Sequence, residues 1–224
     1  MPDAWRKSIF VPIYKNKGYI QNCSNYRGIK LMSHTMKLWE RVIEHCLRRE
    51  AKVSVNQFEF MSRRCIMKVN FLMRQLMARY RKTKKDLHMM FIDLEKAYDR
   101  VLKKVLWWTL EKKKIPLKYV NVIKDMYDMT TTCVKTCNET SSYIPITVGV
   151  HQGSALSSYL FVLVMNELTK DIQEELLWCM FFADDIMLTN KTKECVNKKL
   201  ELWRNTLESK GFTLSWNKTE YMKC

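Results

Sequence analysis

Hydrophobic side chains recur every three or four positions in several long segments of this 224-residue chain. In residues 34–49 and 66–80 they fall on one side of a helix. The first stripe comprises Leu38, Trp39, Val42, Ile43, Cys46 and Leu47, and the second comprises Val69, Leu72, Met73, Leu76, Met77 and Tyr80. Further helices are predicted at 101–112, at 117–129 with Pro116 in its first turn, at 160–172, and at 193–210 with Gly211 at its end.

Shorter segments alternate between apolar and polar residues or are rich in β-branched residues, as strands are. Strands are predicted at 9–14, 87–92, 131–137, 143–148, 179–183, 186–189 and 212–216. Residues 15–27 are polar and basic, which indicates a hairpin loop, and turns are expected at 138–142 and at Asp184-Asp185. Strands and helices in this order predict an α+β fold, in which helices cover one face of an antiparallel sheet.

Three aspartates stand where predicted strands end. Asp93 follows a buried strand, and Asp184 and Asp185 form the tip of a hairpin 91 residues later. Carboxylate oxygens are the ligands that Mg²⁺ prefers, and phosphoryl transfer commonly uses two such ions. Taken singly, an Asp pair is also a common turn former and Asp93 could simply begin a surface loop. Together, in a basic chain, they favour a two-metal site.

The charge of the chain points to a polyanionic partner. Thirty-nine Lys and Arg against 23 Asp and Glu give a formal net charge of +16, which is typical of proteins that bind nucleic acid, although membrane-surface and ribosome-associated proteins share it. Residues 63–85 hold nine basic residues and no acidic one before position 86: Arg63, Arg64, Lys68, Arg74, Arg79, Arg81, Lys82, Lys84 and Lys85. This tract either follows a template backbone or is the solvated face of a helix.

Cysteine usage and the first residues bound the cellular setting. The eight cysteines are scattered, without the spacing of a zinc site, which predicts a reduced intracellular compartment, nuclear or cytoplasmic. Residues 1–10 lack the basic and then apolar order of a signal peptide. The longest apolar stretch, around Tyr159–Met165, is too short to cross a bilayer, so no membrane partner is expected.

Several segments in succession resemble a known family. The runs FIDLEKAYDRV at 91–101, GVHQGSALS at 149–157, FADD at 182–185 and KTE at 218–220 are similar, in order and spacing, to motifs of reverse transcriptases of non-LTR, LINE-type retrotransposons, particularly plant-type copies. Upstream, PIYKNKG at 12–18 and NYRGI at 25–29 resemble the fingers motif of that family. The resemblance implies a right-hand polymerase with fingers at 1–86 and palm at 87–224, in one continuous domain and with the thumb absent.

The resemblance also implies roles for the acidic motifs. Asp93 and Asp184 would be the catalytic, metal-binding aspartates, with Asp185 as a supporting carboxylate at the same two Mg²⁺ ions, which Mn²⁺ could replace. The backbone of Leu94 would lie near the second ion. Tyr98 would be the steric gate that fills the space of a ribose 2′-hydroxyl, so that deoxynucleotides are preferred; its plain alternative is a core aromatic.

Other residues would bind the nucleotide. The resemblance places Gln152 and Gly153 in the nucleotide pocket, where glycine lets the backbone approach closely. Lys218 would donate a proton to the leaving pyrophosphate. The triphosphate would be gripped by basic residues of the fingers, namely Arg27, Lys15 and Lys17. For each of these cations the alternative is an ordinary surface charge, most seriously for the two lysines.

The implied activity is RNA-directed DNA synthesis, with an RNA template, a DNA primer and deoxynucleoside triphosphates as partners. A remnant that at most binds nucleic acid is the alternative from another class, and an RNA-dependent RNA polymerase is disfavoured by Tyr98. The chain departs from the family pattern at Glu59, Ser62 and Arg63, where glycine and proline-glycine are usual, and at Leu102 and Ser158, where proline is usual. A side chain on a positive-φ glycine position would strain the fingers by about 1 kcal/mol or more.

Overall fold

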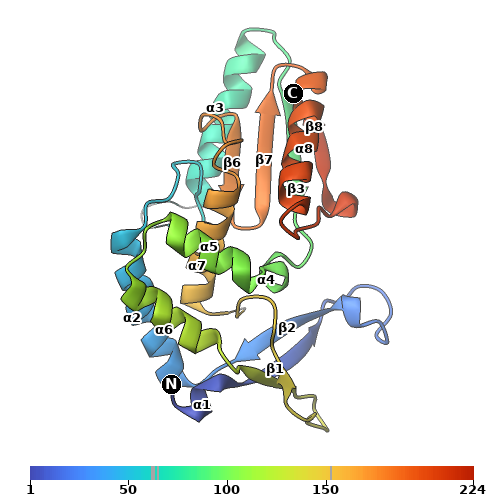
Figure 1. Ribbon diagram of the computed structural model, residues 1–224. Helices are drawn as coiled ribbons and strands as arrows, with labels where there is room; N and C mark the ends of the chain where they lie inside the picture. The colour runs from blue at the N-terminus through green and yellow to red at the C-terminus, as the bar shows by residue number, and fades with distance from the viewer. Residues whose placement is uncertain (62–63, 65, 152) are drawn as a thin grey trace.

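The computed structural model describes residues 1–61, 64, 66–151 and 153–224. These residues form two sheets connected and covered by helices (Figure 1). The longer helices are α2 (His34–Glu50), α3 (Ile66–Lys82), α5 (Lys103–Lys112), α6 (Leu117–Tyr127), α7 (Ala155–Leu168) and α8 (Lys193–Glu208). Short helical segments are α1 (Asp3–Arg6), α4 (Ala97–Arg100), η1 (Cys23–Asn25) and η2 (Trp216–Lys218). The predicted mixed α+β class is therefore confirmed.

The first sheet combines the N-terminal hairpin with a distant segment. Its strand order is β2 (Tyr26–Leu31), β1 (Lys7–Tyr14), β4 (Thr131–Val134) and β5 (Ile144–Pro145). The β1–β2 hairpin and the short β4–β5 pair are antiparallel, as predicted, whereas β1 and β4 run parallel. Residues on both sides of the predicted boundary between 1–86 and 87–224 thus share one sheet, and the boundary itself stays a prediction.

The second sheet carries the aspartates. Its strands, in order, are β6 (Cys179–Phe182), β7 (Asp185–Asn190), β3 (His88–Asp93) and β8 (Glu220–Lys223), and all its neighbours are antiparallel. The strand predicted at 212–216 is wrong. Only Leu214 forms a bridge, to Leu94, because β3 has already ended and the chain turns away at that point. The strand that completes the sheet is β8, which begins six residues after Leu214. The hydrophobic pattern did not predict it.

Helix α2 presents a different face from the one its pattern predicts. Met36, Glu40, Ile43 and Leu47 are buried, whereas Leu38 is largely exposed. The buried stripe has regular helical spacing, but a charged residue within it makes the neighbouring apolar stripe look like the core face. The helix predicted at 160–172 also shifts, to Ala155–Leu168, because the Ser154 side chain accepts a hydrogen bond from the Ser157 amide and caps its first turn.

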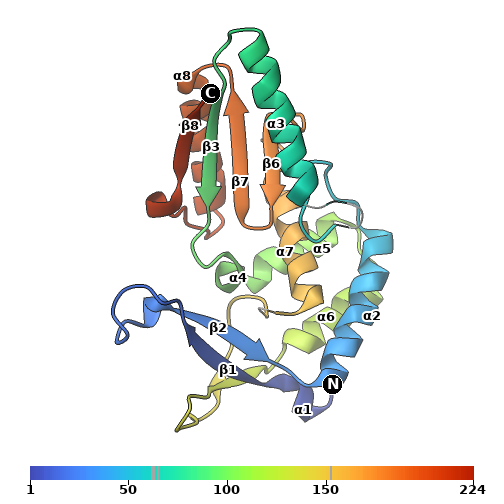
Figure 2. The same ribbon diagram turned by 180° about the vertical axis from the view of Figure 1, so that it is seen from behind.

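Helices lie on both faces of the second sheet. Helices α7 and α8 pack on the face that presents Ile92 and Leu188, in the main core of the protein. Helix α3 lies along the opposite face, near β6, where Val69 packs with Met180 and Met187 (Figure 2). As predicted, helices cover one face of the antiparallel sheet, where α7 and α8 form the main core. Helix α3 lies in addition on the other face. The face beneath α3 is the one that carries Asp93.

The packing of α8 gives a direct test of this core. Trp203 is 1% exposed and its ring centroid lies 5.2 Å from that of Phe181. We expect Trp203→Ala to lower the free energy of unfolding by about 3–5 kcal/mol, because it removes a fully buried ring and leaves a cavity. Urea unfolding followed by circular dichroism measures the change. Leu202→Ala, in the same helix but 51% exposed, is the control and should change stability by less than about 0.5 kcal/mol; equal losses would contradict the assigned packing.

Candidate active site

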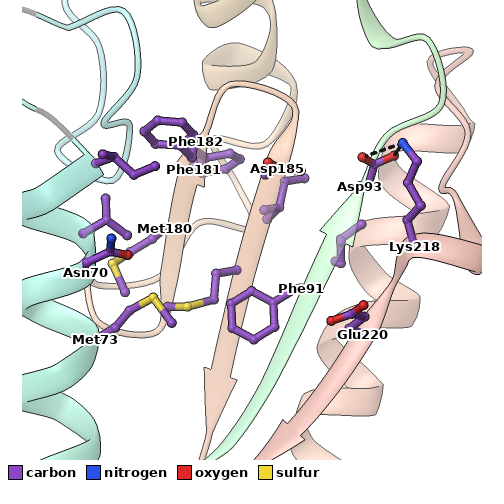
Figure 3. Close-up of a pocket in the computed structure, with 15 residues that line it drawn as sticks. Asn70, Met73, Phe91, Asp93, Met180, Phe181, Phe182, Asp185, Lys218 and Glu220 are labelled. Carbon is purple, nitrogen blue, oxygen red and sulfur yellow. Dashed lines mark hydrogen bonds and ion pairs between the residues drawn. The ribbon is translucent and has the colours of Figure 1, made fainter. Parts of the chain in front are cut away.

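Two aspartates face each other across neighbouring strands. Asp93 is the last residue of β3, Asp185 is the first residue of β7, and the two are paired in register. Side chains at paired positions of an antiparallel sheet point to the same face, and Figure 3 shows both carboxylates at the same end of the sheet. Asp184 lies in the turn immediately before Asp185. The structure therefore brings Asp93 together with Asp184 and Asp185, although 91 positions separate Asp93 from Asp184 in the sequence.

The turn that carries Asp184 has an unusual backbone. Only Ala183 and Asp184 connect β6 to β7, and Ala183 has a φ of +53°. A left-handed conformation at a residue with a Cβ costs about 1 kcal/mol or more. Ala183 is buried, so packing holds it in place. The hairpin thus keeps the acidic tip in one defined conformation.

Lys218 neutralises one of the three carboxylates. Its Nζ donates to both oxygens of Asp93, at 2.9 and 3.0 Å, as Figure 3 shows. Lys218 itself is mostly exposed and belongs to the short helix η2, so it approaches from the solvent side. The ammonium group of Lys218 thus occupies the position at which the negative charge of Asp93 favours a cation.

Burial and mutual repulsion make the other two carboxylates harder to ionise. The pKa of Asp184 is raised, first by burial and then by the charge of Asp93, while Lys218 and Arg27 oppose the rise. The pKa of Asp185 is raised by burial and by the charges of Asp184 and Asp93. The repulsion arises because like charges are held near one another with few cations between them. Such a group of carboxylates favours the binding of cations.

A fourth carboxylate, Glu59, lies near this tip and was noticed in the sequence only as a departure from the family pattern. Its pKa is raised by burial and by the charges of Asp184 and Asp185. The segment before it runs parallel to β6: the Phe58 amide donates to the Phe181 carbonyl at 3.0 Å. Glu59 comes shortly after this pairing, and the acidic turn comes shortly after Phe181. The pairing of the two segments therefore places Glu59 near the acidic turn. The positive φ expected in this segment falls on Phe60, at +57°, and not on Glu59.

The acidic end of the sheet is suited to bind divalent ions together with a phosphate ligand. Among residues 1–61, 64, 66–151 and 153–224, no three His, Cys, Asp or Glu side chains are placed to enclose a metal ion by themselves. Mg²⁺ usually takes one or two protein carboxylates and completes its shell with water and substrate phosphates. Asp93 and Asp185, with Asp184 beside them, provide this kind of open donor set.

The predicted triphosphate-binding residues come from the first sheet. Arg27 lies on β2, and its charge lowers the pKa of Asp184, so its guanidinium is electrostatically linked to the acidic tip. Lys15 and Lys17 lie in the exposed loop between β1 and β2. Figure 1 shows this hairpin extending below the end of the second sheet at which β3 ends. Arg27 is thus electrostatically coupled to the acidic tip from the first sheet, as Lys218 is from η2.

Of the remaining predicted residues, Tyr98 lies in α4 and Leu94 shortly before it, whereas Gly153 precedes α7. Tyr98 stacks on Phe161, with ring centroids 4.6 Å apart, and burial raises its pKa. The side chain of Leu94 is buried in the core. Gly153 has a φ of +90°, and a Cβ there would meet only the Lys30 carbonyl, at 3.9 Å. Glycine is therefore required by backbone conformation and not by crowding. Gln152 lies outside the described residues.

A groove leads away from the aspartates along the sheet. It measures about 350 Å³ and lies between α3 and strands β6, β7 and β3. Apolar side chains line most of it, including Val69, Met73 and Phe91, and Asp93 and Lys218 stand at one end (Figure 3). The basic residues of α3 and the loop after it that are exposed are Lys68, Arg74, Arg79, Arg81, Lys82, Lys84 and Lys85. Arg64 instead donates to the Ser54 and Gln57 carbonyls and supports the loop before Glu59.

Comparison with known proteins gives the same picture. Residues 13–224 match the family described as "Reverse transcriptase (RNA-dependent DNA polymerase)". Similar curated proteins include a Pol polyprotein from type-1 retrotransposable element R2 of Nasonia vitripennis, with 23% identity over 84% of this chain and 19% of that protein. A probable RNA-directed DNA polymerase from transposon BS of Drosophila melanogaster is 28% identical over 87% of this chain and 22% of its own length. The chain thus spans about a fifth of these relatives.

Solved structures support the fold. Apo telomerase from Candida tropicalis, truncated from its C-terminal domain, superposes with a TM-score of 0.65 and 15% identity, over 100% of this chain and 51% of that one. Telomerase from Candida albicans with a fragment of telomeric RNA gives a TM-score of 0.59 at 14% identity, over 99% of this chain and 43% of that one. The predicted fingers and palm architecture is therefore confirmed. No helix among the described residues is long and apolar enough to cross a membrane.

The repulsion among the carboxylates predicts a substitution that stabilises the protein. Asp184→Asn should raise the free energy of unfolding at pH 7.5, in EDTA, by up to about 1 kcal/mol, since solvent screens part of the repulsion. Because the pKa of Asp184 is higher in the folded state, the parent protein gains relative stability as the pH falls. The advantage of the variant should therefore shrink toward about pH 4. Urea unfolding at both pH values measures it, with the exposed Asp171→Asn as control; a destabilised variant would contradict the assigned repulsion.

Proposed function

Since this chain belongs to the reverse transcriptase family, we propose that it catalyses RNA-directed DNA synthesis at the site formed by Asp93, Asp184 and Asp185. The observation that carries the proposal is the register pairing of Asp93 with Asp185, which gathers three carboxylates at one end of a sheet. The reaction would join the α-phosphate of a deoxynucleoside triphosphate to the 3′-hydroxyl of a primer paired to RNA, with release of pyrophosphate. We further propose that, among non-LTR retrotransposons, the chain belongs with the plant-type copies.

The carboxylates would hold two divalent cations, Mg²⁺ or Mn²⁺. When bound, such ions polarise the 3′-hydroxyl and neutralise the charge of the triphosphate. Asp93 and Asp184 would each contribute oxygens from rigid positions, Asp93 at a strand end and Asp184 in the strained turn after Ala183. Asp185 would support the same ions, and the Leu94 carbonyl would lie near the second one. The chain thus supplies fixed negative charge where positive charge must gather.

Lys218 would serve two states of the site. Its ammonium now bonds both oxygens of Asp93, which offsets the repulsion among the aspartates. With cations bound, Asp93 would release Lys218 toward the triphosphate, where the ammonium would protonate the leaving pyrophosphate. The exposure of Lys218 and its position at the end of a short helix support such a move.

The fingers and α4 would select and hold the nucleotide. Arg27, together with Lys15 and Lys17, would bind the triphosphate through charge-assisted hydrogen bonds. Tyr98 would exclude a ribose 2′-hydroxyl, and its stacking on Phe161 supports a fixed position for the ring. Gly153 and Gln152 would line the same pocket. The exposed basic residues of α3 would contact the template backbone.

The proposed setting is intracellular, either nuclear or cytoplasmic. In the part of the chain that the structure describes, the cysteines are free, which supports a reduced compartment. The rival proposal is a remnant that binds nucleic acid without extending a primer. An extension assay combined with a salt-dependent binding assay separates the two, since a remnant would bind and not extend.

Removal of one carboxylate charge tests the catalytic assignment. We expect the parent protein to extend a DNA primer on RNA with Mg²⁺ and deoxynucleotides, and Asp184→Asn to reduce the rate by at least about 100-fold, because metal-dependent charge stabilisation is lost. Gel-resolved primer extension measures the rate, and Asp171→Asn, which removes one carboxylate charge at an exposed position outside the site, is the control. Extension by Asp184→Asn at the parent rate would refute the assignment, and its stability in urea excludes misfolding as the cause of a loss.

The steric gate is tested by removing the aromatic ring. Tyr98→Ala should increase the use of ribonucleotides relative to deoxynucleotides by at least about tenfold, which corresponds to 1.4 kcal/mol. The ratio of kcat/KM values for the two nucleotide classes measures this preference. Phe161→Leu, which removes the stacking partner and keeps Tyr98, should change the ratio less. An unchanged ratio in Tyr98→Ala would assign the ring to the core alone.

A further inference from the structure

A cluster of polar side chains is buried behind the residues assigned to the nucleotide. Glu40 on α2 is 1% exposed and His151, just after residues 149–150, is 4% exposed. Lys30 on β2 is half-buried beside them. These three side chains come from the first sheet, from α2 and from the loop before α7. They meet where the fingers contact the palm.

The cluster is not held together by ordinary hydrogen bonds. Within the described residues, both ring nitrogens of His151 and the Oε2 atom of Glu40 have no hydrogen-bonding partner. The closest approach of the pair is 3.9 Å, between His151 Nδ1 and Glu40 Oε1. Buried polar groups are normally paired, and an apolar pair would fill this space at lower free energy. The presence of these groups therefore calls for a role other than stability.

A cavity beside the cluster is lined by the first sheet, by α4 and by the segment 146–151. It measures about 180 Å³, and its lining includes Gly28, Lys30, Asp99 and His151. Three of these residues are sequence neighbours of the assigned nucleotide-binding residues: Gly28 of Arg27, Asp99 of Tyr98, and His151 of Gly153 at a distance of two positions. The cavity and the cluster thus adjoin the segments that carry the assigned nucleotide-binding residues.

Backbone hydrogen bonds connect the cluster to the steric gate. The amide of Val150 donates to the Tyr98 carbonyl at 2.9 Å, and the amide of Gly149 donates to the Val101 carbonyl at 3.0 Å. On its other side, the His151 ring packs on Tyr127, with centroids 4.6 Å apart. A displacement of His151 would therefore move the backbone that carries Tyr98. Glu40 and Lys30 set the position of His151 relative to the fingers.

The charges of the cluster define its state at neutral pH. Burial lowers the pKa of His151, despite the opposing charge of Glu40, so the imidazole is neutral. Burial lowers the pKa of Lys30 to about 8, with Lys103 adding to the fall and Glu40 and Asp99 opposing it. Tyr127, which also faces Glu40, stays neutral because burial raises its pKa. At pH 7 the cluster thus contains the Lys30 ammonium and a neutral His151 beside Glu40.

We propose that Glu40, His151 and Lys30 act together as positioning residues for the incoming nucleotide. They fix the distance between β2, which carries Arg27, and the backbone of residues 149–151, which is hydrogen-bonded to Tyr98 through Val150. The triphosphate and the sugar are then held by two elements at a constant separation. This inference rests on the proposed function, since it assigns a task within the same nucleotide site.

The variants Glu40→Gln and His151→Gln test the proposal. Each should raise KM for deoxynucleotides by about tenfold and change kcat by less than about threefold, because the pocket is displaced while the aspartates are untouched. Glu44→Gln and His45→Asn, which alter similar side chains one turn further along α2, are the controls and should leave KM unchanged. Thermal unfolding of each variant establishes that it is folded. Unchanged KM values in both cluster variants would overturn the proposal.

The pH dependence of KM separates positioning from a merely structural role. In the parent, KM for deoxynucleotides should rise above about pH 8, as Lys30 loses its charge and Glu40 is left unpaired. Lys30→Met should show a raised KM at pH 7 and no such rise, whereas Lys30→Arg should restore a low KM that stays constant to pH 9. The same rise above pH 8 in Lys30→Met would assign the titration to another group and overturn the role of Lys30.

Binding without turnover distinguishes failure of this inference from failure of the proposed function. A fluorescent deoxynucleoside triphosphate is titrated into each protein with Ca²⁺ and a primed RNA template. A parent that binds the nucleotide but does not extend the primer, with Kd raised about tenfold in Glu40→Gln, would refute the proposed activity and support the positioning role. A parent that extends, with equal Kd in all variants, would refute the positioning role alone. A parent that neither binds nor extends would refute both.

Discussion

The acidic end of the second sheet depends on carboxylates that burial and mutual repulsion make costly to ionise, and Lys218 offsets that repulsion only in part. Asp93 and Asp185 are paired across two strands, and Asp184 adjoins them, so each carboxylate increases the cost of ionising the next. A protein selected for stability alone would place hydrogen-bonded or apolar residues at the end of this sheet. The sheet tolerates the arrangement because its other face is packed against α7 and α8. A bound cation would reduce the repulsion among these carboxylates.

The elements around the acidic tip restrain it from three directions. The buried Ala183 fixes the turn, Lys218 bonds Asp93 from the solvent side, and residues 56–58 pair with β6 from the fingers. The first sheet then brings Arg27 into electrostatic reach of Asp184. Each contact joins segments that are far apart in sequence. The polymerase-like site is therefore a property of the whole domain and not of any one motif.

Sequence patterns predicted most of the elements because the periodic segments are long and the turns are marked. The hairpin at Asp184-Asp185 and the pairing of its strands followed from alternation and from a turn-forming pair. The buried face of α2 could not be predicted, since Glu40 occupies a core position that hydropathy assigns to solvent. The strand β8 was equally hidden, because all four of its residues are exposed and show no alternation. Glu59 and His151 gain meaning from neighbours in three dimensions that sequence patterns do not reveal, such as Asp184 for Glu59 and Glu40 for His151, each more than 100 positions away.

The parallel pairing of β1 with β4 has a consequence for how the chain reaches its fold. Lys7 pairs with Thr131, so β1 finds its second neighbour only after more than 120 further residues have been made. Until then β1 and β2 form a hairpin on their own, with both edges unpaired, and isolated hairpins are marginally stable in water. Sheets built from such distant segments form slowly. We therefore expect the N-terminal hairpin to stay incompletely paired until β4 has been made, and the second sheet likewise awaits β8, so neither sheet is complete before most of this chain has been synthesised.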